Sequence, residues 1–301
     1  MHTITTGLHF PEAPVALNDG SVVLVEIAAQ RITRVAADGT KFVLAETGGG
    51  PNGLAFGPDG RLYCCNNGGF EFSRTVEGHW RPGLATQDYT GGSIQRIDIG
   101  TGLVETLYTC AGNIPLRGPN DIVFDAHGGF WFTDHGKAFA RSRDRCGVFY
   151  ARTDGSHIEQ VIPPCPPMES ANGIGLSPDG TVLYVADTNT CYLVAWDIIA
   201  PGQVDPEAWR IVHRTAGMGW FDSLALEECG NICVATLGKG GITVIAPDGD
   251  LVEFVETGDI FSTNICFGGP DRKTAYITNS GIGSLIAIPW ARAGLALENP
   301  T

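Results

Sequence analysis

The sequence has little positive charge and no long hydrophobic run. Its 301 residues include 19 Lys and Arg against 33 Asp and Glu, which gives a formal net charge of −14. A chain with so few basic residues has no patch with which to neutralise phosphates, which argues against a nucleic-acid-binding protein. No apolar run is long enough to span a bilayer. The segment 1–6 lacks the basic start and apolar stretch of a signal peptide, so we expect a cytoplasmic protein without a membrane partner.

Two familiar catalytic signatures are also missing. The chain contains neither a Gly-x-Ser-x-Gly nucleophile elbow nor a Gly-x-x-x-x-Gly-Lys-Ser/Thr phosphate loop. The nine cysteines are an odd number and favour a reducing compartment without a disulfide framework. Several of them lie inside apolar runs and are expected to be small buried hydrophobes, namely Cys64, Cys65, Cys233 and Cys266. Cys229 and Cys233 have no second Cys or His pair nearby, so they are weak evidence for zinc.

The chain is rich in glycine, with 41 residues, and it contains a sequence motif that occurs six times. Each copy opens with an acid or an amide, passes through an apolar run, turns, and enters a strand. The clearest copies span 51–63, 119–131 and 171–184, and weaker ones begin near Glu12, Phe221 and Thr263. Repeats of this length, each a small unit of strands, are typical of a β-propeller.

The spacing of the copies predicts the number of blades. The steps between successive heads are 40 (12 to 52), 68 (52 to 120), 52 (120 to 172), 50 (172 to 222) and 42 (222 to 264) residues. A four-stranded blade takes roughly 40 to 50 residues, so five steps imply an all-β, six-bladed propeller, 1–301, in a single domain. The 68-residue step needs an insertion, which we place at about 69–91 and interpret as a lid or a surface excursion. A short helix is suggested only at 206–209 and in the last residues.

The residue that heads each copy is an oxygen ligand. The six heads are Glu12, Asn52, Asn120, Asn172, Asp222 and Asn264. Equivalent positions of the innermost strands form a ring around a propeller's axis, so the heads should meet at one mouth of the central channel. Two carboxylates and four carboxamides gathered there would destabilise each other without a cation. Taken singly, any one Asn-Gly is an ordinary turn; the six aligned positions together predict a central-channel metal site. All-oxygen donors suit Ca²⁺, Mg²⁺ or Mn²⁺ better than Zn²⁺ or Fe²⁺.

The same residues resemble a known family over essentially the whole chain. The stretches that carry the likeness are Pro11 to Pro14, Cys65 to Gly69, Pro119 to Asp121 followed by Gly129 to Asp134, and Ala171 to Gly173. They resemble the senescence marker protein, gluconolactonase and luciferin-regenerating enzyme group, in particular bacterial members that act on sugar lactones. The resemblance implies a six-bladed propeller that holds one divalent cation, with Ca²⁺ the first expectation, and that most often hydrolyses sugar lactones.

The resemblance also implies roles for individual residues. Glu12, Asn172 and Asp222 match the metal ligands of the family, and Asn120 matches a residue that contacts substrate and sometimes the metal. Asn52 and Asn264 match channel positions beside the ligands, of which Asn52 is also a candidate for substrate binding.

This chain departs from the family pattern at several positions near the site. Ser223 and Ala13 stand where glycine is usual, and neither change removes a ligand. Arg117 lies three residues before Asn120 rather than two, which weakens its expected grip on substrate. His135 replaces a usual proline on the rim, so the substrate can differ too.

These residues could together open a lactone ring. A divalent cation polarises the carbonyl and stabilises the tetrahedral oxyanion, and water then needs a base. Asp222 is the first candidate base, with a hydroxide on the cation as the competing nucleophile and His135 as a second base. Arg117 and His135 are also candidates for binding substrate, whereas Asp121 and Asp134 are expected to cap turns or orient neighbours.

Two other classes of function stay open. One is a metal-dependent hydrolase of a non-sugar ester or an organophosphate, which would be favoured if the aromatics near the insertion line the mouth. They are Phe70, Phe72, Trp80, Tyr89, Trp220 and Phe221. The other is a binding propeller without catalysis, which has no need of two carboxylates at a channel mouth. The sequence leaves the oligomeric state open.

Overall fold

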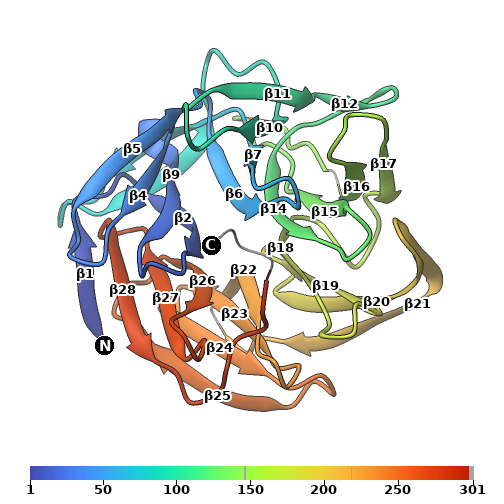
Figure 1. Ribbon diagram of the computed structural model, residues 1–301. Helices are drawn as coiled ribbons and strands as arrows, with labels where there is room; N and C mark the ends of the chain where they lie inside the picture. Colours follow the sequence, from blue (N-terminus) through green and yellow to red (C-terminus); the bar gives the residue numbers. More distant parts are fainter. Residues whose placement is uncertain (146, 218, 298–301) are drawn as a thin grey trace.

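The computed structural model describes residues 1–145, 147–217 and 219–297. Its strands form six four-stranded antiparallel sheets arranged around a central axis as the blades of a propeller (Figure 1). The predicted six-bladed β-propeller is therefore confirmed. Among the described residues there is no α-helix, and no helix is long and apolar enough to cross a membrane.

The first three blades follow one another along the chain. Their strands, from the axis outward, are β2 (Pro11–Ala16), β3 (Val22–Glu26), β4 (Arg31–Val35) and β5 (Lys41–Glu46); β6 (Pro51–Phe56), β7 (Leu62–Asn66), β10 (Ser93–Ile97) and β11 (Val104–Tyr108); and β14 (Pro119–Phe124), β15 (Gly129–Asp134), β16 (Val148–Arg152) and β17 (Ile158–Ile162). A 3₁₀ turn, η1 (Ile27–Ala29), follows β3, and a short hairpin of β12 (Cys110–Ala111) and β13 (Ile114–Pro115) follows β11.

The last three blades repeat the pattern, and the chain closes the ring on itself. Their strands are β18 (Ala171–Leu176), β19 (Val182–Asp187), β20 (Tyr192–Ala200) and β21 (Gln203–Arg214); β22 (Trp220–Leu226), β23 (Ile232–Leu237), β24 (Gly241–Ile245) and β25 (Leu251–Glu256); and β26 (Ser262–Gly268), β27 (Thr274–Asn279), β28 (Ser284–Pro289) and β1 (His2–Thr6). Because β1 pairs with β28, the N-terminal strand completes the sheet that the C-terminal strands begin.

The short helix expected at 206–209 is wrong. These residues lie inside β21, where Trp209 pairs with Trp196 of β20 and Arg210 Nη1 lies 2.7 Å from Asp197 Oδ1. Cross-strand pairing therefore overrides the local preference that suggested a helix.

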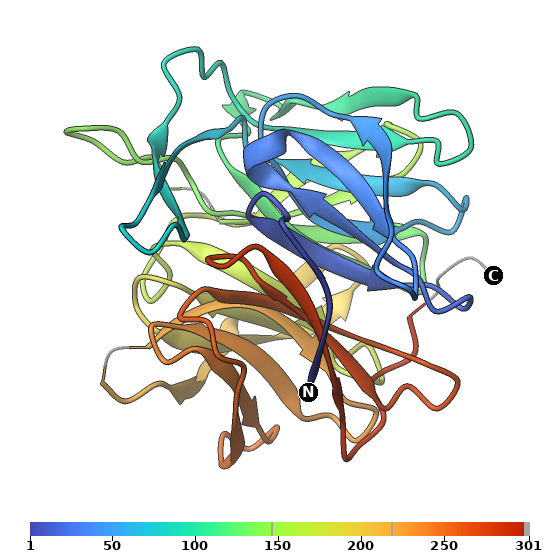
Figure 2. The ribbon, with the colours of Figure 1, turned by 90° about the vertical axis from the view of Figure 1, so that its left-hand side faces the viewer.

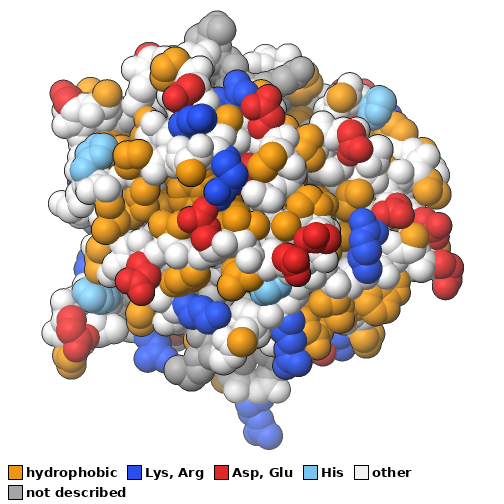
Figure 3. Space-filling model, turned by 90° about the horizontal axis from the view of Figure 1, so that it is seen from below, with side chains coloured by type: hydrophobic (Ala, Val, Ile, Leu, Met, Phe, Trp, Pro, Cys, Tyr) orange, Lys and Arg blue, Asp and Glu red, His pale blue; other side chains and the backbone are white. Residues whose placement is uncertain are grey.

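Alternating residues of the inner and middle strands pack between neighbouring blades. Each interface is a compact apolar cluster, such as Trp131, Ile174 and Val194 between the third and fourth blades. On the side of the molecule seen in Figure 3, hydrophobic side chains at the surface lie scattered among acidic and basic ones. The core thus consists of the spaces between blades, which leaves the inner strand of each blade to line the axis.

A hairpin of β8 (Phe70–Arg74) and β9 (Trp80–Ala85) lies within the segment 69–91, between the second and third strands of its blade. Figure 2 shows this hairpin and the loop after β15 projecting from the same side of the propeller. Trp80 donates its backbone N–H to Gly281 O (2.7 Å) and its ring N–H to Leu8 O (3.1 Å), while Ala85 N donates to Ala138 O (3.0 Å). The hairpin therefore joins loops of the first, third and sixth blades.

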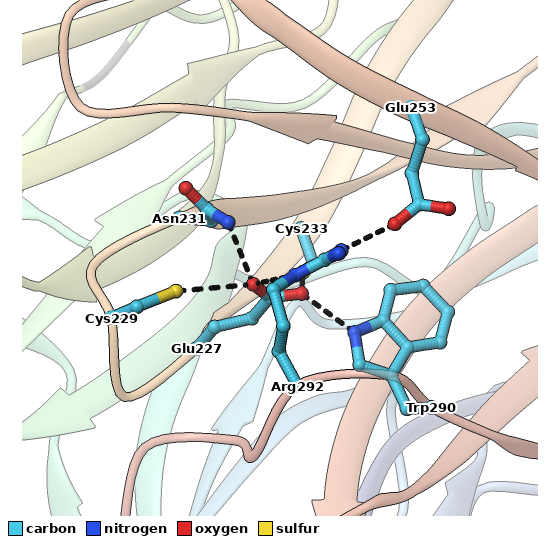
Figure 4. A network of polar contacts seen from close by, with 7 residues as sticks. All are labelled: Glu227, Cys229, Asn231, Cys233, Glu253, Trp290 and Arg292. Carbon is cyan, nitrogen blue, oxygen red and sulfur yellow. Dashed lines mark hydrogen bonds and ion pairs between the residues drawn. The ribbon is translucent and has the colours of Figure 1, made fainter.

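The opposite side of the propeller is held by the carboxylate of Glu227, which follows β22 (Figure 4). Trp290 Nε1 donates to it at 2.6 Å, Asn231 Nδ2 donates at 2.7 Å, and Arg292 forms an ion pair with it. The thiols of Cys229 and Cys233 also point at it, at 3.4 and 3.6 Å. This network attaches the C-terminal segment to the fifth blade, and the two thiols serve as its donors.

Candidate active site in the central channel

The six head residues lie on the six innermost strands, and all are buried. Their exposed fractions are 4% for Glu12, 6% for Asn52, 7% for Asn120, 5% for Asn172, 8% for Asp222 and 6% for Asn264. Each inner strand contacts the inner strands of the two neighbouring blades, so the six form a closed ring. We call the end at which these strands begin the channel mouth.

Two glycines bring neighbouring heads to the same level. A Cβ on Gly53 would lie 2.4 Å from the carbonyl oxygen of Asn120, and one on Gly173 would lie 2.6 Å from that of Asp222. Any side chain there would push the inner strands apart. The Asn-Gly pairs of the sequence thus serve close packing between blades as well as the turn.

Irregular pairing positions the heads. In β6, β14, β18 and β22 the head and the residue after it face a single residue of the next strand, as in a β-bulge. A bulge disrupts the ladder locally and re-aims a side chain, which is a frequent device beside active sites. In these four blades the repeated motif therefore corresponds to a β-bulge at the start of the innermost strand.

Glu12 has few partners for a buried carboxylate. Its Oε2 accepts from Asn264 Nδ2 at 2.8 Å and from the backbone N–H of Ala13 at 2.6 Å. Burial raises the pKa of Glu12 to about 7, and these hydrogen bonds offset only part of that effect. The role of Asn264 in the ring is therefore to fix the carboxylate of Glu12 through this hydrogen bond.

Asp222 and Asp121 are two further buried carboxylates whose charges interact with that of Glu12. Burial and then the charge of Glu12 raise the pKa of Asp222 well above its usual value, although a hydrogen bond from Asn172 opposes the shift. Burial and then Glu12 also raise the pKa of Asp121, to about 7. Ser223, the residue that replaces glycine, hydrogen bonds to Asp121.

Sequence reasoning assigned Asp121 only a capping or orienting role. Its Oδ1 does accept the N–H of Ile122 at 2.9 Å, yet the residue is 7% exposed and carries the third channel carboxylate. Its place directly after Asn120, as the second residue of the bulge, is the signal that could have identified it.

The neutral donors of the ring fit a cation. The side-chain oxygens of Asn120 and Asn172 are buried and have no hydrogen-bond partner. Asn172 Nδ2 donates to Thr188 Oγ1 at 3.0 Å, so the other end of this amide is fixed. Within the described chain no three His, Cys, Asp or Glu residues are grouped as metal ligands, so a cation here would depend on amide oxygens. Carboxylates with raised pKa values and unpartnered amide oxygens are the donor set of a hard divalent cation.

Arg117 and His135 lie on the rim of the channel mouth and are engaged by other residues. Arg117 Nε is 3.6 Å from Asp144 Oδ2, and its side chain is 40% exposed. His135 Nε2 accepts from Arg143 at 3.0 Å. Burial, followed by the charge of Arg143, lowers the pKa of His135 to about 3. An imidazole with so low a pKa is a weak base at neutral pH, which argues against His135 as the base.

The chain is similar in sequence to proteins of a known family. The family model described as the SMP-30/gluconolactonase/LRE-like region matches residues 10–281. The chain is 30% identical over 202 residues to the lactonase drp35 of Staphylococcus saprophyticus, covering 66% of this chain and 54% of that one. It is 30% identical over 162 residues to the 6-deoxy-6-sulfogluconolactonase of Pseudomonas putida, covering 54% and 53%. The chain thus spans about half the length of these curated relatives.

Solved structures support the fold. A gluconolactonase from Xanthomonas campestris has a TM-score of 0.73 at 21% identity, over 95% of this chain and 88% of that one. A calcium-binding protein, regucalcin, from Agrobacterium tumefaciens has a TM-score of 0.74 at 16% identity, over 100% and 99%. At these identities the likeness concerns the propeller alone.

Proposed function

The chain belongs to the SMP-30/gluconolactonase/LRE-like family, and from this premise we propose that it is a divalent-cation-dependent lactonase that opens the ring of a sugar lactone. The observation that carries the proposal is the channel mouth, where three buried carboxylates with raised pKa values adjoin amide oxygens without partners. Relatives named as lactonases, and a structural neighbour named as calcium-binding, support the same reaction and Ca²⁺ as the first cation to test.

Glu12, Asn172 and Asp222 would hold the cation. When bound, it would supply Lewis acidity at the lactone carbonyl and neutralise the negative charge of the mouth. Asn264 keeps the carboxylate of Glu12 in place, and Thr188 does the same for the amide of Asn172. The side-chain oxygen of Asn172 is thereby left available.

Asp222 is the proposed general base. It would accept a proton from water as the water oxygen attacks the carbonyl carbon, and the same proton would pass to the ring oxygen when the acyl C–O bond breaks. Burial and the charge of Glu12 raise the pKa of Asp222, which makes this carboxylate a stronger base than an exposed aspartate. The unpartnered oxygen of Asn120 would accept a hydrogen bond from a substrate hydroxyl, with Asn52 as its neighbour in the ring.

The alternative of a non-sugar ester or an organophosphate receives little support from the aromatic side chains that could favour it. Phe70, Phe72 and Trp80 pack against the core between the first two blades, and Phe221 is fully buried. Trp220 is 41% exposed. Tyr89 donates its hydroxyl to Arg117 O at 2.6 Å. Four of the six rings thus have packing roles, and the polar heads offer the better match to substrate.

The test is a hydrolysis assay that follows acid release with aldono-γ-lactones, aldono-δ-lactones and aryl lactones. Each reaction would be run with EDTA and after addition of Ca²⁺, Mn²⁺, Mg²⁺, Zn²⁺ or Fe²⁺. We expect turnover of at least one aldonolactone, loss with EDTA, and restoration by one cation. Hydrolysis of aryl lactones alone would favour a non-sugar hydrolase, and binding of a cation with no turnover of any lactone would contradict the proposal.

A further inference from the structure

A second polar group at the channel mouth is held in one orientation but lacks a partner. Asn67 follows β7, is 1% exposed, and has a side-chain nitrogen, Nδ2, that is buried without a hydrogen bond. The middle strands of the blades run antiparallel to the inner ones, so the end of β7 lies at the channel mouth beside the start of β6. Asn67 N donates to Gly50 O at 2.8 Å, two residues before the head Asn52.

The orientation of the Asn67 amide follows from its other contacts. Its Oδ1 accepts from Lys137 Nζ at 2.9 Å and from Gly69 N at 2.9 Å. An ammonium and a backbone N–H can only donate, so the oxygen must face them and the nitrogen must face away. A Cβ on Gly50 would lie 2.3 Å from the same oxygen, so the amide is also pressed against the backbone that leads to Asn52.

The chain uses a buried lysine to maintain this orientation. Lys137 is 1% exposed, donates to both Asn67 O (2.7 Å) and Asn67 Oδ1, and has its Nζ 3.6 Å from the centroid of the Phe70 ring. Burial lowers the pKa of Lys137 to about 7. Lysine is rarely buried so completely, and a donor left without a partner is unfavourable. Both features are explained if the nitrogen of Asn67 has a ligand.

Building on the lactonase proposed above, we infer that Asn67 is a substrate-binding residue whose Nδ2 donates a hydrogen bond to a hydroxyl oxygen of the lactone. The mouth then offers one fixed donor together with the free acceptor oxygen of Asn120. Because each hydroxyl of a sugar both donates and accepts, this combination suits a lactone with several hydroxyls better than an unsubstituted one. Lys137 acts as a positioning residue through Asn67.

The test uses Asn67→Asp, which keeps the oxygen that accepts from Lys137 and Gly69 and removes only the N–H donors. The new charge forms an ion pair with Lys137, so the fold should be preserved. We expect KM for a hydroxylated aldonolactone to rise about 10-fold, with kcat and the KM for an unsubstituted lactone little changed. An unchanged KM for both lactones in a folded variant would overturn the inference.

The matched control is Asn66→Asp, the same change at the neighbouring position. Both ends of the Asn66 amide are satisfied within the chain, by Gly50 N, Gly68 N, Gly48 O and Gln95 Oε1. We expect a lower Tm in this variant without a change in KM that depends on substrate hydroxyls. A hydroxyl-dependent change as large as that of Asn67→Asp would overturn the inference, since charge alone would then explain both.

A second variant and a binding measurement keep the test decisive. If Asn67→Asp fails to fold, Lys137→Met leaves the amide but frees it to turn, and the same hydroxyl-dependent rise in KM is expected; a folded Lys137→Met with wild-type KM values would count against the inference. If the wild type hydrolyses no lactone, the proposed function fails, and calorimetric binding of an aldonate is compared between the wild type and Asn67→Asp. Weaker binding by the variant supports the inference; equal binding, or none by the wild type, overturns it.

Discussion

Asp222 and Glu227 are buried carboxylates at opposite ends of the innermost strand of the fifth blade, five positions apart, and their pKa values shift in opposite directions. Burial would raise the pKa of Glu227, but hydrogen bonds from Arg292, Trp290, Asn231 and Cys229 outweigh it and the net shift is downward. Asp222 has no such set of donors and has two further carboxylates in its field, so its pKa rises. Glu227, which holds the fold together, has Arg292 as its counter-charge (Figure 4). The carboxylates at the channel mouth have few compensating donors.

The difference separates stability from function within one strand. A fully satisfied carboxylate has nothing left with which to bind a ligand. Glu12, Asp121 and Asp222 make the unliganded protein less stable at neutral pH and thereby favour any cation that neutralises them. Removing a carboxylate charge should therefore change the free energy of unfolding in opposite directions at the two ends of the strand.

The largest expected effect is on activity. Asp222→Ala and Glu12→Ala should each abolish cation retention and reduce kcat/KM at least about 1000-fold, since both the cation and the oxyanion stabilisation are lost. Cation content by elemental analysis and kcat/KM for an aldonolactone are measured side by side, with circular dichroism reporting the fold. Full activity in either variant with cation bound would show that the site is assigned wrongly.

Breaking the Glu227 network should affect stability instead. Arg292→Met leaves the buried carboxylate without its counter-charge, so we expect about 3 kcal/mol of destabilisation with unchanged cation affinity. The exposed pair of Arg210 and Asp197 is the control, and Arg210→Met should cost under about 1 kcal/mol. Urea unfolding measures both variants, and equal losses would mean that burial does not distinguish the two ion pairs.

Removing a charge at the channel mouth should instead stabilise the cation-free protein. In cation-free protein at pH 8, Glu12→Gln should raise the free energy of unfolding by about 2 kcal/mol, since a pKa near 7 makes the buried charged form unfavourable. The amide oxygen can still accept from Asn264 and Ala13. Glu227→Gln is the comparison variant, and it should lower stability under the same conditions. A destabilised Glu12→Gln would mean that the charge at the mouth is already compensated.

The smallest effect is a gradual dependence on pH. Glu12 and Asp121 have folded pKa values of about 7, above the usual values of 4.5 and 3.8, so the folded state binds their protons more tightly. Their contribution to stability is fully present below the usual values and is lost as the pH rises through about 7. The Tm of cation-free protein should therefore fall between pH 5 and pH 8, and excess Ca²⁺ should remove the decline. A Tm that rises over this range without cation would contradict the raised pKa values.

Much of the architecture could be predicted because it repeats. The acid or amide, the apolar run and the turn recur six times, and a pattern of local hydrogen bonds and alternating burial is legible along the chain. The same periodicity placed all six heads at one level of the ring. The exception at 206–209 is also instructive, since the partner that makes this segment a strand lies across the sheet.

The sequence by itself determined the propeller, the number of blades and the identity of the six heads, since each blade follows from a local pattern that repeats along the chain. Only the tertiary structure decided which carboxylates share a field, that Asp121 is among them, that Arg143 engages His135, and that Lys137 fixes Asn67. Those relations join distant segments: Asn264 and Glu12 are 252 residues apart, and Lys137 and Asn67 are 70 apart. Burial and charge act through space, so a pKa or the orientation of an amide follows only once the blades are packed together.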